Sequence, residues 1–141
     1  MESKYFKPYE LVDRDVYKLL EDDSIKLIDP RLIETIDAVR EILDVSLICN
    51  NWYWSGSRSQ CGYRSKACFI GAPKSFHKLG LAVDLISTKM TAKEMRDKLK
   101  KNEDSLPHPI RIEKWDDNGE IDWLHIDLGD TKGNKIYFFK A

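Results

Sequence analysis

Two short segments that carry histidine and aspartate constrain the fold of this chain more than any other feature. The first runs from Ser75 to Asp84 and contains His77, and the second contains Asp122 and His125. Two imidazoles and a carboxylate are a common set of three protein ligands for catalytic zinc, with a fourth position left open for water. If His77, Asp84 and His125 hold one metal ion, the chain must fold so that both segments meet at one point.

Each of these residues also has a structural interpretation. A single histidine in such a chain is more often a surface or hydrogen-bonded residue than a metal ligand. Asp84 is harder to explain in this way, because Val83 and Leu85 flank it and a buried carboxylate needs a partner. Residue types and spacing alone therefore leave both a metal and an ion pair open for Asp84.

Length and composition predict one globular domain without a nucleic-acid or membrane partner. The chain has 141 residues, of which 42% are hydrophobic and 33% charged, enough for a core of ordinary composition. A net charge of -1 and the lack of a basic stripe count against a nuclease. No apolar stretch approaches the ~20 residues that span a bilayer. Residues 1–7 lack the apolar core of a signal peptide, so we expect synthesis in the cytoplasm, and we expect a monomer.

Capping residues and apolar periodicity predict two main helices. Asp29 and Pro30 are typical of a helix start, and an apolar stripe at helical spacing predicts that this helix runs to about Leu43. Thr91 begins a capping box with the glutamate three residues later, which predicts a second helix to about Lys101. Both helices should bury one apolar face.

Short apolar or alternating segments predict a sheet. The turn Asp116–Gly119 is a strong hairpin signal. We expect strands at Val45–Cys49, Leu81–Ile86, Ile110–Trp115, Glu120–Leu128 and Lys135–Phe139, and a less regular helix around Asp13–Glu21. Residues 50–76 should form a long loop that contains Trp52, Tyr53 and Trp54. The elements together predict an α+β fold with helices packed on an antiparallel sheet.

The motif-bearing segments resemble a known enzyme family. Ser75–Asp84 has the pattern Ser-x-His-x-x-Gly-x-Ala-x-Asp, Asp122–His125 has the pattern Asp-Trp-x-His, and Gly62–Ser65 reads Gly-Tyr-Arg-Ser. In this order they are similar to motifs of the zinc D-Ala-D-Ala carboxypeptidases and L-alanyl-D-glutamate endopeptidases, a family that includes phage endolysins and shares its fold with the Hedgehog signalling domain. The likeness covers about residues 45–128. It implies a Hedgehog/DD-peptidase-like fold and a single peptidase domain over residues 1–141.

The resemblance also implies one Zn²⁺ per chain and roles for single residues. The matched positions are the metal ligands His77, Asp84 and His125, the catalytic Asp122 and Arg64, and the substrate-binding Arg64 and Ser75. Asp122 would be the general acid and base. The Arg64 guanidinium would bind a substrate carboxylate or carbonyl, because its fork can donate two parallel hydrogen bonds. Ser75 would orient the substrate or His77.

Two departures from the family pattern leave alternatives open. The gap between Arg64 and His77 is short, which makes Arg58 a competing substrate arginine. The loop around Trp52 also differs from the expected approach. His108 lies between two prolines, where it is either a surface residue or close to the site.

The identity of the general base is open on pattern alone. On a regular strand Asp122 points away from the face that carries His125 and Asp127. It reaches the site only if it precedes the regular strand or lies at a bulge. Asp127 and Glu120 are therefore rival bases; of these the pattern favours Asp127, whereas the resemblance favours Asp122.

The expected function is a zinc metallopeptidase that hydrolyses peptidoglycan stem peptides. Carboxypeptidase action on D-Ala-D-Ala and endopeptidase action on L-Ala-D-Glu need the same catalytic set, so the sequence does not separate them. An endolysin-like enzyme of phage origin would act at the cell wall. The alternatives are a non-catalytic zinc-containing binding module on the same fold and a protein-interaction domain that uses the aromatic loop.

Overall fold

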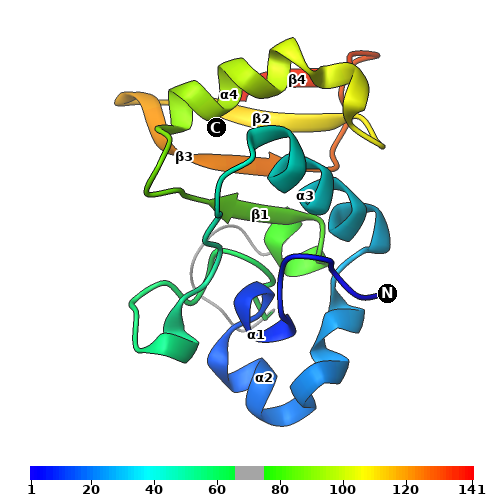
Figure 1. Ribbon diagram of the computed structural model, residues 1–141, viewed down its shortest axis with the longest axis vertical. Coiled ribbons are helices and arrows are strands. Elements are labelled where there is room, and N and C mark those ends of the chain that lie inside the picture. Colours follow the sequence, from blue (N-terminus) through cyan, green and yellow to red (C-terminus); the bar gives the residue numbers. More distant parts are fainter. Residues whose placement is uncertain (66–74) are drawn as a thin grey trace.

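The computed structural model describes residues 1–65 and 75–141 and contains a sheet of four strands, which lies in the upper half of Figure 1. The strands are β1 (Ala82–Leu85), β2 (Ile110–Asp116), β3 (Gly119–Asp127) and β4 (Ile136–Lys140). Their order is β1-β3-β2-β4, with β1 and β2 antiparallel to β3 and with β4 parallel to β2. The expectation of an antiparallel sheet is therefore wrong for the β2–β4 pair, and the sheet is mixed.

The course of the chain after β3 explains the parallel pair. Asp127 at the end of β3 lies opposite Arg111 near the start of β2. The chain then passes to the other side of β2, where Ile136 pairs with Ile110. Because β4 begins at the same end of the sheet as β2, the two strands run in the same direction.

The expected hairpin between β2 and β3 is confirmed. Asp116 and Gly119 are the last paired residues of the two strands. The Asp116 side chain accepts a hydrogen bond from the backbone N–H of Asn118 at 2.8 Å, which closes the turn. Gly119 has a φ of +114°, a conformation that glycine adopts without a steric penalty.

Two helices, α3 (Pro30–Leu43) and α4 (Ala92–Lys101), pack on the sheet as expected (Figure 1). The side chains of Asp29 and Thr91 cap their first turns, as the sequence predicts. The core between these helices and the sheet is apolar and is built from Leu32, Ile36, Met95, Leu99, Ile112, Leu124 and Ile126. The molecule is thus a small α+β domain.

The remaining helical elements are short. They are α1 (Pro8–Leu11), α2 (Arg14–Leu20), η1 (Glu21–Leu27), η2 (Trp52–Trp54), η3 (Phe76–Leu79) and η4 (Glu103–Ser105). The expected strand at Val45–Cys49 is wrong, because only one residue there, Ile48, forms a bridge, with Ile86. Among the described residues, the helices are too short or too polar to cross a bilayer.

Alternation along the strands gives the sheet two different faces. Ile112 and Ile126 are fully buried in the apolar core. Their neighbours along each strand point to the opposite face of the sheet, where Arg111, Glu113 and His125 line a pocket. That polar face carries the candidate site.

Candidate metal centre

His77 lies in the short turn η3, whose two ends are fixed by local contacts. At the start, the Ser75 hydroxyl accepts a hydrogen bond from the His77 backbone N–H at 3.3 Å. At the end, Gly80 has a φ of +71°. A Cβ atom at residue 80 would lie 1.9 Å from the carbonyl oxygen of Leu27, so the turn can pack there only with glycine.

The orientation of the buried His77 ring follows from one hydrogen bond. Its Nδ1 lies 3.0 Å from the Gly62 carbonyl oxygen, which can only accept, so Nδ1 carries the proton. The other nitrogen, Nε2, is 3.4 Å from Oδ2 of Asp84. Nε2 therefore faces the carboxylate and is the nitrogen of this ring that can bind a metal ion beside it.

Asp84 and His125 are brought together by strand pairing. They are direct partners in the antiparallel register of β1 and β3. Oδ1 of Asp84 lies 2.8 Å from Nδ1 of His125. The sheet therefore places a carboxylate and an imidazole side by side from segments that are 41 residues apart in the chain.

The three residues form a group with the geometry and chemistry of a metal site. Ligand atoms of His77, Asp84 and His125 all lie within 4.8 Å of one another. The ring nitrogen of each histidine that faces away from Asp84 has its own hydrogen-bond partner. Nε2 of His125 lies 2.8 Å from Oδ2 of Asp127, and Nδ1 of His77 lies 3.0 Å from the Gly62 carbonyl oxygen. Metal-ligating histidines are usually held in this way by a carboxylate or a carbonyl, so the group could hold a metal ion.

Asp127 is tied to its neighbours by four hydrogen bonds. Besides His125, it accepts from Nε and Nη2 of Arg111 at 2.7 and 2.9 Å and from the backbone N–H of Gly129 at 2.9 Å. The carboxylate is fully buried. These contacts occupy the lone pairs of Asp127, so its position suits the orientation of His125 rather than proton transfer.

The charges of the group are strongly coupled. Burial favours the neutral ring, but hydrogen bonds to Asp127 and Asp84 raise the pKa of His125 to about 9. Burial also opposes ionisation of Asp84, yet hydrogen bonds from His125 and His77 hold its pKa well below the usual value. Without a metal, His125 is thus a cation between two carboxylates at neutral pH, and metal binding must displace its proton.

The two candidate arginines occupy different places. Arg64 donates from Nε to the Gln60 carbonyl at 2.6 Å, and its Nη2 lies 3.5 Å from Oδ2 of Asp84. Arg58 instead donates to the backbone carbonyls of Cys49 and Asp84 at 2.8 and 3.3 Å. The residues His77, Asp84 and His125 are called the metal group below. Arg64 contacts the carboxylate of this group, whereas Arg58 contacts only backbone carbonyls next to it.

An open pocket of about 470 Å³ lies over the metal group. It is lined by Arg64, Ser75, Phe76, His77, Asp84, Arg111, Glu113, Trp123, His125, Asp127, Phe139 and Ala141. Arg64 and Ser75, to which the resemblance gives substrate-binding roles, both line this pocket. The aromatic rings of Phe139 and Phe76 lie near the Arg111 guanidinium, at 4.0 and 5.0 Å from ring centre to Cζ.

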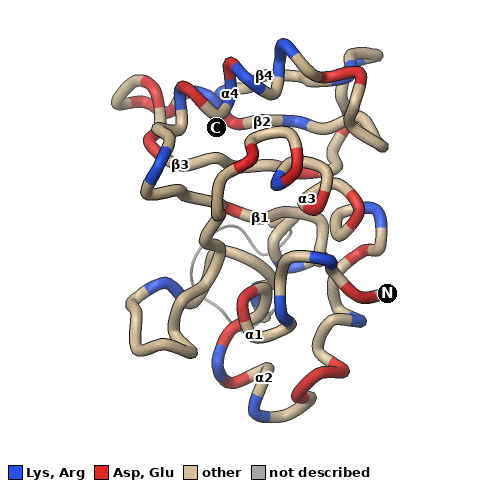
Figure 2. The backbone as a smooth tube through the Cα atoms, in the orientation of Figure 1, with Lys and Arg blue, Asp and Glu red and all other residues tan. Residues whose placement is uncertain are grey.

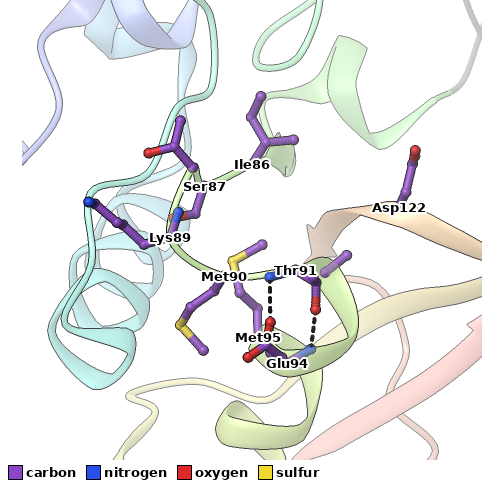
Figure 3. A pocket seen from close by; sticks show the side chains of 10 residues that line it. Ile86, Ser87, Lys89, Met90, Thr91, Glu94, Met95 and Asp122 are labelled. Atoms are coloured by element: carbon purple, nitrogen blue, oxygen red, sulfur yellow. Dashed lines mark hydrogen bonds between the residues drawn. The ribbon is translucent and has the colours of Figure 1, made fainter.

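Asp122 is not among the residues of this pocket. Its exposed side chain lines a neighbouring pocket beside residues 86–91 and the first turn of α4 (Figure 3). The carbonyls of Ile121 and Trp123 on either side accept hydrogen bonds from the buried Arg96, at 3.1 and 3.5 Å. The pairing of β2 and β3 is irregular here, but the structure does not bring Asp122 to the three ligands.

Glu113 lines the metal pocket, although the sequence patterns did not mark it as a site residue. It lies directly opposite His125 in the register of β2 and β3 and is half-buried. Within residues 1–65 and 75–141, its carboxylate has no hydrogen bond or ion pair, and burial raises its pKa. One sequence pattern could have indicated it: Arg111 and Glu113 alternate with isoleucines along β2. The hairpin places Arg111 opposite Asp127 and Glu113 opposite His125.

The other residues weighed from the sequence lie elsewhere. Nε2 of His108 is 3.3 Å from Glu34 and does not line the metal pocket. Glu120 is exposed and lies 4.0 Å from Lys114. Neither side chain is placed for chemistry at the metal group.

Comparison of the chain with known proteins gives no family for it. No family model, no curated protein and no solved structure matched the chain. The residues of the metal group and its pocket are therefore the ground for a functional proposal.

Proposed function

We propose that this protein is a zinc-dependent peptidase that hydrolyses stem peptides of the bacterial cell wall. The observation that carries the proposal is the convergence of His77, Asp84 and His125 within 4.8 Å at the base of an open pocket. The likeness of their two segments to cell-wall peptidase motifs supports the substrate class. Cleavage of D-Ala-D-Ala and of L-Ala-D-Glu are both compatible with this site.

In this proposal His77, Asp84 and His125 hold the metal, and the chain keeps their donor atoms in place. Zinc bound there would polarise the scissile carbonyl and lower the pKa of a coordinated water toward ~7. Gly62 and Asp127 hold the outer nitrogens of the two imidazoles, so both rings keep one orientation. Preorganised ligands of this kind lose little entropy when the metal binds.

Arg64 and Ser75 are the proposed substrate-binding residues. Both line the pocket. The Arg64 guanidinium suits the carboxylate or carbonyl of a peptide, because it can donate two parallel hydrogen bonds. It would hold the scissile bond beside the metal ligands. Ser75 would act through the substrate or through its contact with the His77 backbone.

Two carboxylates compete for the role of general base. Asp122 has the position that the motif resemblance implies, three residues before His125. Glu113 lines the metal pocket, and burial raises its pKa, so it accepts a proton more readily than an exposed glutamate does. Either residue would accept the proton of the attacking water and deliver it to the leaving amine.

The first experiment measures metal content and hydrolysis of purified stem peptides, before and after chelation. About one zinc per chain, with activity lost on chelation and restored by zinc, is the expected result. His125→Ala should lose both zinc and activity, while His108→Ala is the matched control because His108 lies outside the pocket. Folded protein without bound metal or turnover would contradict the proposal.

A second experiment assigns the base. Asp122→Asn and Glu113→Gln keep the size of each side chain and remove its ability to accept a proton. The variant of the true base should retain zinc and lose roughly 10²–10⁴-fold in kcat. Full activity in both variants would exclude both residues.

One observation favours a second function, a zinc-containing binding module without catalysis. Asp122, the residue that the motif assigns to proton transfer, does not line the metal pocket. In that case the wild-type protein binds about one zinc and binds stem peptides in equilibrium dialysis, but releases no products. Product masses therefore decide between the two functions.

A further inference from the structure

An aromatic cluster lies on the surface of the N-terminal half, and none of its members lines the metal pocket. It consists of Tyr9 in α1, Tyr17 in α2, and Trp52, Tyr53 and Trp54 in η2. Tyr53 and Trp54 remain 52% and 58% exposed. Large aromatic rings that lie together on a surface usually mark a site of interaction.

Contacts within the cluster hold the exposed rings in one arrangement. Tyr53 stacks on Tyr9 with centroids 3.9 Å apart, and Trp54 meets Tyr53 edge to face at 5.9 Å. Trp52 is anchored by a hydrogen bond from its indole Nε1 to the Val12 carbonyl at 2.9 Å. Because these rings are already ordered, a ligand that packs on them immobilises few side chains.

Trp52 also forms one wall of a polar hollow of about 300 Å³. The hollow is lined by Asp13, Arg14, Asp15, Trp52, Gly56, Ser57, Ser59 and Gln60. It therefore offers the Asp15 carboxylate, the Arg14 guanidinium and the hydroxyls of two serines next to an indole ring. Such a set can donate and accept several hydrogen bonds within a small space.

The combination of flat rings and a polar hollow fits a sugar. A pyranose has an apolar C–H face, which packs on aromatic rings, and a rim of hydroxyls, which need donors and acceptors. We propose that the aromatic cluster and this hollow bind a hexopyranose unit of a polysaccharide. This site is separate from the proposed peptidase chemistry and does not depend on it.

Two other ligands fit the surface less well. A cation would meet Arg14 in the hollow, and two nearby acids already accept hydrogen bonds: Asp13 from Val16 N at 2.8 Å and Asp22 from the Tyr17 hydroxyl at 3.2 Å. Figure 2 shows basic and acidic segments side by side along α1 and α2. A second copy of the chain would cover the rings but leave the charged hollow beside them without a complement.

The test titrates ¹⁵N-labelled protein with the trisaccharides of N-acetylglucosamine and of glucose. We expect at least one of them to shift the indole signals of Trp52 and Trp54 saturably, with a Kd of roughly millimolar order. Trp54→Ala and Asp15→Ala should each weaken that binding by at least about tenfold. Trp115→Ala is the matched control, because Trp115 is a 39% exposed tryptophan on β2, outside the cluster, and it should leave Kd unchanged.

Thermal melting of each variant shows that the fold is retained. The proposal is overturned if neither trisaccharide shifts the two indole signals, or if Trp115→Ala weakens binding as much as Trp54→Ala. It is also overturned if lysine amide alone gives the saturable shifts, which would identify a cation site. Shifts that follow protein concentration without added sugar would identify a self-association surface and overturn it as well.

Discussion

Replacement of Asp127 by asparagine tests whether the environment of His125 is built for a metal. The amide has nearly the size of the carboxylate, so packing is preserved. Its nitrogen cannot accept a hydrogen bond, yet the native Oδ2 lies 2.8 Å from Nε2 of His125. An amide nitrogen at that position would face the Nε2 proton, and relief comes when Nε2 loses that proton, which leaves a neutral ring with its one proton on Nδ1.

A proton on Nδ1 has a direct cost for metal binding. Nδ1 of His125 is the nitrogen that faces Asp84, at 2.8 Å, and it must be unprotonated to bind a metal. Loss of a residue that orients a metal ligand typically weakens metal affinity by about 10–100-fold. We therefore expect the Kd for zinc to rise by that factor in Asp127→Asn, equivalent to about 1.4–2.8 kcal/mol.

Competition with a chromophoric zinc chelator at fixed pH measures this change. Asp130→Asn is the matched control, because Asp130 is exposed and its contacts are to Lys132. An unchanged zinc Kd in folded Asp127→Asn would show that the Asp127–His125 contact does not orient a ligand. Equal weakening in both variants would point to a general effect of lost negative charge instead.

Three further predictions concern stability. Free zinc at a thousandfold above its Kd should stabilise the protein by about 4 kcal/mol, seen as a higher Tm in calorimetry; an unchanged Tm would contradict specific binding. Gly80→Ala should be less stable in urea than Gly133→Ala, because both residues have positive φ but only the Cβ at residue 80 meets backbone; equal losses would refute this. The metal-free protein should lose stability as pH falls below about 4, because folding lowers the pKa of Asp84 and Asp127. It should also lose stability as pH rises through about 9, where His125 loses its proton. Urea midpoints that stay constant from about pH 3 to about pH 10 would contradict this prediction.

The local signals in the sequence predicted most of the fold. Capping residues at Asp29 and Thr91 act through neighbouring backbone groups, so they mark helix starts without knowledge of the rest of the chain. The hairpin turn before Gly119 is equally local. The parallel pairing of β4 was not predicted, because it depends on which side of β2 the chain takes after Gly129.

The candidate metal ligands were predictable as residue types, and their convergence follows from the sheet. Burial of an aspartate between apolar residues on a short strand is unfavourable unless the carboxylate has a partner, and His125 is the partner of Asp84. Asp127 and Glu113 were harder to assign, because their roles depend on strand register. A shift of one residue would have turned both side chains to the opposite face.

The position of Asp122 shows the limit of motif reasoning. The motif assigns Asp122 a role at the site, but a spacing of three residues from His125 places it on the opposite face of a strand unless a bulge turns it back. The irregular pairing near Trp115 and the hydrogen bonds from Arg96 determine the path of the backbone there. These are contacts between distant segments, which spacing alone does not encode.

The large sequence separation between Asp84 and His125 has a consequence for the lifetime of the folded protein. The two residues are 41 positions apart, and they meet only when β1 has paired with β3. A metal ion held by both would form a cross-link late in folding, after the slow closure of that loop. It would have to be released before the two strands separate. Metal supply would therefore act chiefly on the rate of unfolding, and with it on how long the chain survives among proteases.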